Sequence, residues 1–65
     1  MKKYLWIVFE NYETGEAFLA KADTSTDWSY EKIRPNSFYE DMFESYNKMD
    51  CINFLHKWYN WDGNK

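Results

Sequence analysis

The chain has 65 residues and a formal net charge of −3 at pH 7, and 23% of its residues are Phe, Trp or Tyr. This length predicts one small domain, residues 1–65, and excludes a second independently folding one. No stretch clusters lysine and arginine, so we expect no direct binding to duplex nucleic acid.

Residues 3–11 are predicted to form the first strand, because β-branched and aromatic residues dominate them. The apolar run at 4–9 indicates burial on both faces of that strand. It is too short for a membrane span or for the core of a signal peptide, so we expect an intracellular protein. Alternation predicts two opposite faces, with Tyr4, Trp6 and Val8 on one and Leu5, Ile7 and Phe9 on the other.

A second strand is predicted over residues 16–22, joined to the first by a short loop at 12–15. Gly15 is suited to the left-handed position of such a hairpin loop. The letters Glu13-Thr14-Gly15-Glu16 resemble the ETGE peptide motif that docks on Kelch-repeat propellers, where two glutamates on a tight turn meet arginines. A hairpin turn with glycine at its tip produces the same letters, and we interpret them as turn chemistry.

The connector over residues 23–34 begins with a polar, turn-like stretch. Residues 27–33 fit one helical turn capped by Thr26 or Asp27, and they also fit an edge strand because apolar and polar residues alternate. We favour the edge strand slightly, since Pro35 follows it and proline is tolerated at a sheet edge.

The stretch from Ser37 to Trp61 is predicted to be helical. Ser37 and Glu40 have the spacing of a capping box, with Ser at the N-cap and Glu at N3. Helical spacing places seven apolar residues on one side of the first half: Phe38, Tyr39, Met42, Phe43, Tyr46, Met49 and Ile52. It places the acids Glu40, Asp41 and Glu44 on the other side.

The apolar pattern changes phase after Asp50. A second stripe follows at i, i+3, i+4, i+7 and i+8, formed by Cys51, Phe54, Leu55, Trp58 and Tyr59. Asp50 is a good N-cap for a new helix, so we favour a break or kink near residues 49–50 over one continuous helix. The predicted fold is therefore α+β: a β-hairpin or three-stranded antiparallel sheet packed against a C-terminal segment of one kinked helix or two short helices.

The aromatic residues are more numerous than the core of so short a chain needs, and this surplus favours binding. We predict Trp58, Tyr59 and Trp61 as partner-binding anchors, because Trp and Tyr are enriched at interface hot spots. The alternative is that Trp58 and Tyr59 pack on the hairpin and Trp61 covers the end. Glu40, Asp41 and Glu44 would form an acidic face that steers a partner, the alternative being an ordinary solvated helix face.

Cys51 and His56 are the best soft metal ligands, but their spacing does not place them on one helix face and no second Cys or His completes a set. We therefore predict no metal and no cofactor. A Cys–His pair with a nearby aspartate on one short segment does not enclose a pocket, so we predict no catalytic residue and no enzyme. A lone cysteine also suits the reducing cytoplasm.

These features together predict a non-enzymatic module that binds another protein. In size, acidity and aromatic content the chain is similar to small inhibitors encoded by phages and other mobile elements, including anti-restriction and anti-CRISPR proteins. That similarity implies an inhibitor of a larger host protein, such as one that processes nucleic acid. The alternatives are a homo-oligomer, in the simplest case a homodimer, that buries aromatic residues between copies, and a weak binder of single-stranded nucleic acid.

Overall fold

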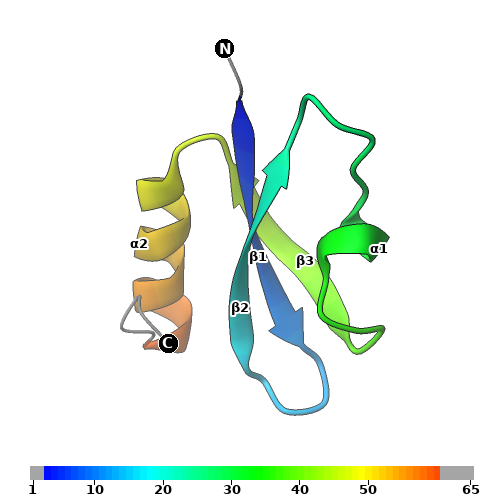
Figure 1. Cartoon of the computed structure of the whole chain (residues 1–65). Helices are drawn as coiled ribbons and strands as arrows, with labels where there is room; N and C mark the ends of the chain where they lie inside the picture. Colours follow the sequence, from blue (N-terminus) through cyan, green and yellow to red (C-terminus); the bar gives the residue numbers. More distant parts are fainter. Residues whose placement is uncertain (1–2, 61–65) are drawn as a thin grey trace.

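The computed structural model describes residues 3–60, which form one sheet and two helices. In chain order the elements are β1 (Tyr4–Asn11), β2 (Ala17–Asp23), α1 (Tyr30–Ile33), β3 (Tyr39–Ser45) and α2 (Lys48–Tyr59). The strands are antiparallel in the order β2-β1-β3, and the two helices lie on opposite sides of the sheet (Figure 1). The predicted α+β class, with a three-stranded sheet and a C-terminal helix, is confirmed.

β1 is the central strand, and its apolar run is buried on both faces as predicted. The core on the α1 side consists of Leu5, Ile7, Phe9, Ala20 and Ala22. The core on the α2 side consists of Val8, Cys51 and Leu55. A strand covered on both faces has no polar side to present to water, which explains why its sequence is a continuous apolar run.

The hairpin between β1 and β2 forms as predicted. The side-chain oxygen of Asn11 accepts hydrogen bonds from the backbone N–H groups of Glu13 and Thr14, at 2.9 and 3.2 Å. Gly15 has a φ of 78° and donates its N–H to the carbonyl of Asn11. Glycine is favoured there because a side chain disfavours positive φ.

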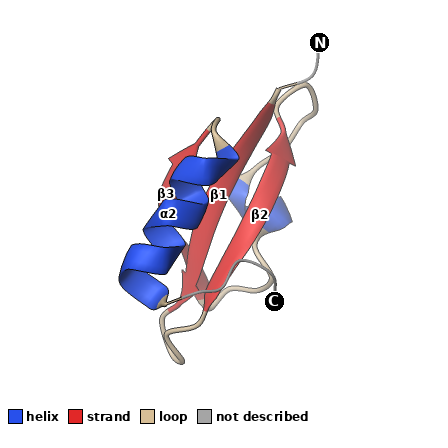
Figure 2. Ribbon diagram, turned by 90° about the vertical axis from the view of Figure 1, so that its left-hand side faces the viewer, coloured by secondary structure: helices blue, strands red, loops and turns tan. Residues whose placement is uncertain are grey.

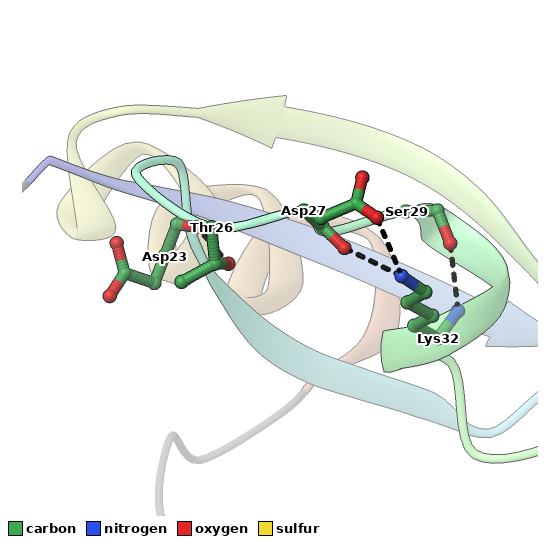
Figure 3. Close-up of polar contacts among 5 residues, drawn as sticks. All are labelled: Asp23, Thr26, Asp27, Ser29 and Lys32. Atoms are coloured by element: carbon green, nitrogen blue, oxygen red, sulfur yellow. Dashed lines mark hydrogen bonds and ion pairs between the residues drawn. The ribbon is translucent and has the colours of Figure 1, made fainter.

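The predicted edge strand at residues 27–33 is wrong, and the helical turn is the correct alternative. α1 begins after Ser29, whose side-chain oxygen accepts a hydrogen bond from the N–H of Lys32. The cap is therefore Ser29, and neither Thr26 nor Asp27 serves as one. Asp27 contacts the Lys32 side chain: the Lys32 ammonium donates to the Asp27 backbone carbonyl oxygen at 2.7 Å and forms an ion pair with the Asp27 carboxylate at 3.4 Å (Figure 3).

The first half of the predicted helix is wrong, because Tyr39–Ser45 is a strand. The predicted capping box at Ser37 does not form, since Glu40 is paired with Glu10 of β1. Asn36 instead organises the approach to the strand, its side-chain oxygen accepting the N–H of Phe38 at 2.8 Å. The third strand of the sheet thus lies later in the chain, at Tyr39–Ser45, than the alternation of residues 27–33 predicted.

Strand pairing explains why residues 39–45 form a strand although their apolar spacing predicts a helix. β1 needs a partner on both of its edges, because a buried strand cannot leave backbone N–H and C=O groups unpaired. The register also contains a β-bulge: Val8 pairs with Phe43 whereas Phe9 pairs with Asp41, which leaves Met42 as an extra residue. A bulge breaks the two-residue alternation, and the resulting spacing of apolar residues imitates helical periodicity.

α2 begins at Lys48, so the phase change marks a strand-to-helix boundary and not a kink in a helix. Its N-cap is Asn47, whose side chain accepts the N–H of Met49, and the predicted cap at Asp50 is wrong. α2 lies over β1 and β3 (Figure 2) and buries Cys51 and Leu55, as the second stripe predicted. Neither described helix has the length and apolar character needed to cross a membrane.

Candidate partner-binding surface

An aromatic surface runs from the edge strand β3 onto α2. It consists of Phe43, Phe54 and Trp58, and we call it the aromatic surface. The rings of Phe43 and Phe54 are stacked, with 4.7 Å between centroids and 6° between planes. Trp58 follows Phe54 by one helical turn, 6.4 Å from it between ring centroids. The side chains therefore form one continuous apolar strip from β3 to α2.

Trp58 is the exposed end of this strip. It remains 63% exposed, whereas its neighbours Phe43 and Phe54 are half-buried. The ammonium of Lys57 lies 5.3 Å from the centre of the Trp58 ring and leaves most of the indole accessible to water. The predicted anchor Trp58 is thus on the surface, and the alternative that it packs on the hairpin is wrong. Its role in binding stays a prediction.

Tyr59 has a structural role in addition to any contact with a partner. It is half-buried, its ring lies 6.1 Å from that of Phe54, and its hydroxyl donates a hydrogen bond to the Glu10 carboxylate at 2.6 Å. Burial, together with this bond, raises the pKa of Tyr59 to about 12. The bond ties the last turn of α2 to β1 and so fixes the helix end that presents Trp58. Trp61, the third predicted anchor, lies outside the described residues.

The predicted acidic helix face does not exist, because its three residues lie on a strand. Glu40 pairs with Glu10 and lies on the α2 side of the sheet, beside the aromatic surface. Asp41 and Glu44 pair with Phe9 and Ile7 and therefore lie on the opposite, α1 side. Of these three acids, only Glu40 lies on the same side of the sheet as Trp58 and can contact the same partner.

Glu44 has a specific partner on the α1 side. The Tyr30 hydroxyl donates to its carboxylate at 2.5 Å. This bond, helped by burial and by the negative charges of Glu44 and Asp41, raises the pKa of Tyr30 to about 12. Glu44 therefore contributes to the attachment of α1 to β3, a role that sequence reasoning did not assign to it, whereas Asp41 acts on Tyr30 only through its charge.

Lysine side chains cover a second aromatic cluster that the sequence analysis did not anticipate. The ammonium of Lys21 lies 4.6 Å from the ring centre of Tyr4 and 5.6 Å from that of Trp6. Lys48, at the start of α2, lies 4.9 Å from the Trp6 ring. Only the strand register, in which Trp6 faces Lys21, brings these residues together. The alternation of Tyr4 and Trp6 was the one signal available in the sequence.

Cys51 and His56 lie in different environments. Cys51 is fully buried and donates its S–H to the carbonyl of Trp6 at 3.3 Å, and burial raises the pKa of the thiol to about 11. His56 is exposed on α2. Over residues 3–60, no group of three or more His, Cys, Asp or Glu side chains is arranged to hold a metal ion. What the described surface offers chemically is apolar contact, ring stacking and charge.

No protein-family model, curated protein sequence or solved structure matches the chain.

Proposed function

We propose that this chain is a non-enzymatic module that binds another protein through the aromatic surface, with Trp58 as the central anchor. The observation that carries this proposal is the exposure of Trp58 at the end of a stacked pair of phenylalanines. Leaving so large an apolar side chain in water forgoes roughly 1.5–3 kcal/mol of burial free energy. A partner with an apolar pocket would recover that free energy on binding.

The charge next to the aromatic surface defines the partner further. Glu40 lies on the same side of the sheet, next to Glu10, and the chain as a whole has a net charge of −3. We therefore propose an apolar pocket on the partner whose rim is basic where it meets Glu40, because opposite charges at the rim accelerate association, whereas Lys57 contributes a positive charge beside Trp58 itself. The narrower hypotheses, an inhibitor of phage type and a host nucleic-acid-processing target, remain predictions, as do cytoplasmic localisation and the absence of catalytic activity.

Single-stranded nucleic acid is a second candidate, favoured by the lysines beside Tyr4 and Trp6. Its phosphates would contact Lys21 and Lys48 and its bases would stack on the rings. The ammonium groups already lie within 4.6 to 5.6 Å of the ring centres, so a base would have to displace a lysine to stack. Protein binding is therefore the better-supported proposal.

Substitution of Trp58 tests the proposal. The tagged chain would capture partners from nuclease-treated lysate, and the affinity of each purified partner would be measured by titration calorimetry. We expect Trp58→Ala to weaken binding about 30-fold, because a hot-spot residue contributes about 2 kcal/mol. The free energy of unfolding of Trp58→Ala should differ from that of the wild type by less than about 1 kcal/mol, since the side chain is exposed.

Tyr46→Ala is the matched control, because Tyr46 is an aromatic residue with the same 63% exposure on another part of the surface. It should leave the affinity unchanged. Equal loss of binding in both variants, or unchanged binding by Trp58→Ala, would contradict the proposal. Retention on single-stranded DNA that disappears in Lys21→Ala and falls steeply with salt would favour the second candidate instead.

A further inference from the structure

The two edges of the sheet differ in how they are protected against pairing with another strand. β3 carries three acidic residues and no basic one, and the bulge at Met42 interrupts its regular geometry. Charges and bulges on an edge strand are devices that prevent further strand addition. Two β3 edges would also bring six carboxylates together. β3 is thus a protected edge.

β2 is the opposite edge, and its backbone offers regular hydrogen-bonding groups. The N–H of Asn11 bonds to the carbonyl of Glu16, and the N–H of Thr24 bonds to that of Lys3, which fixes which residues face β1. Because orientation alternates along an antiparallel strand, the backbone groups of Leu19 and Lys21 point away from β1. No described strand pairs with them.

The side chains of β2 protect this edge less than those of β3 protect theirs, because the one lysine, Lys21, has its ammonium over the rings of Tyr4 and Trp6. The β2 sequence, AFLAKAD, contains no proline or glycine and carries one lysine and one aspartate, so the strand is electrically neutral. Its register with β1 is regular over the whole strand, without a bulge. Phe18 is 41% exposed on it. A regular, neutral and largely apolar edge strand is a template for strand pairing.

We propose that β2 pairs antiparallel with β2 of a second copy of this chain, making a continuous six-stranded sheet across a two-fold axis. The antiparallel pairing of a strand with itself is self-complementary and closes after two copies. Pairing of β2 with β3 of another copy would leave edges at both ends, and the bulge and acids of β3 oppose it. This dimer does not depend on the aromatic surface, which lies toward the β3 edge of the sheet.

Substitution of Lys21 by proline tests whether two β2 strands pair. Lys21→Pro removes the side chain and, of the backbone hydrogen-bonding groups, only an outward-facing N–H, so the β1–β2 ladder is kept. The preceding Ala20 is already in the extended conformation that proline requires. Lys21→Ala is the matched control, because it removes the same side chain and keeps the N–H. Masses would be measured by sedimentation equilibrium from low-micromolar to millimolar protein, with folding checked by circular dichroism.

We expect wild type and Lys21→Ala to reach the mass of two chains and Lys21→Pro to remain a folded single chain. A single-chain mass for wild type at every concentration would overturn the proposal. A two-chain mass for Lys21→Pro, or loss of the dimer in Lys21→Ala, would overturn it as well. If Lys21→Pro does not fold, hydrogen exchange of the wild type decides: the amides of Leu19 and Lys21 should exchange more slowly as protein concentration rises, and unchanged rates would overturn the pairing.

Discussion

Two tyrosine hydroxyls attach the helices to the sheet. Tyr59 binds Glu10 and so joins α2 to β1, and Tyr30 binds Glu44 and so joins α1 to β3. A hydrogen bond to a charged acceptor contributes roughly 1.5–3 kcal/mol where it is shielded from water, and less at a half-exposed site. Apolar packing holds each helix against the sheet, and these two bonds additionally fix where each helix lies on it.

These bonds predict a loss of stability in alkali. The pKa of both tyrosines rises from 10 in the unfolded chain to about 12 in the folded one. Below about pH 10 both states keep the proton and the stabilisation is intact, whereas between about pH 10 and 12 only the unfolded state ionises. The free energy of unfolding, measured by urea denaturation at several pH values, should therefore fall through this window.

The double variant Tyr30→Phe, Tyr59→Phe should flatten that decline, because it removes both hydroxyls. Tyr46→Phe, at an exposed tyrosine, controls for the substitution itself and should keep the decline. An equally steep decline in the double variant would show that other groups cause it.

Cys51 is predicted to be unreactive in the folded protein. The thiolate is the reactive form, and the pKa of Cys51 is raised from 9 to about 11 by burial. Near neutral pH the thiolate population is therefore about a hundredfold smaller than in the unfolded chain. Reaction with Ellman's reagent should be at least that much slower in buffer than in denaturant. Similar rates in the two solvents would show that the α2 core opens readily.

At the scale of elements, local capping residues specify where α2 begins and ends, and its N-cap lies at Asn47, earlier in the chain than predicted. Asn47 caps its first turn, with its side-chain oxygen 3.0 Å from the N–H of Met49. Asp50, the predicted cap, instead accepts a hydrogen bond from the Ser45 hydroxyl at 2.8 Å. Asn60, with a φ of 53°, ends the helix in the left-handed conformation that asparagine tolerates.

Asn47→Ala is expected to lower the free energy of unfolding by about 1 kcal/mol, because it leaves the first N–H groups of α2 without a cap. Asn47→Asp is the matched control, since aspartate also accepts that hydrogen bond and adds a favourable charge at the helix start. Urea denaturation of the three proteins measures the difference. A loss of the same size in Asn47→Asp would mean that the cap is not the cause.

At the scale of the whole molecule, the sheet separates two sides with different roles. On one side α1 and its connector cover the larger core, and Asp41 and Glu44 face them. On the other side α2 leaves Trp58 exposed beside Glu40. The binding surface that we propose lies toward β3, and the dimer edge that we propose is β2. One chain could thus use both at once, and the Trp58 and Lys21 variants test the two proposals separately.

The sequence by itself determined the elements whose signals are local. The hairpin follows from Gly15 and two alternating strands, the burial of β1 from its apolar run, and α2 from the stripe that begins at Cys51. Each signal depends on residues that are near one another in the chain. The exposure of Trp58 was also expected, because its stripe holds more aromatic residues than a small core can bury, and its role as an anchor stays a prediction.

Only the tertiary structure decided the state of residues 39–45. Their apolar spacing fits a helix and also a bulged strand. The choice depends on the second edge of β1, which lies far earlier in the chain and must be paired. The same pairing separated Glu40 from Asp41 and Glu44 and brought Lys21 to Trp6. Register is a relation between distant segments, and no local pattern in either segment contains it.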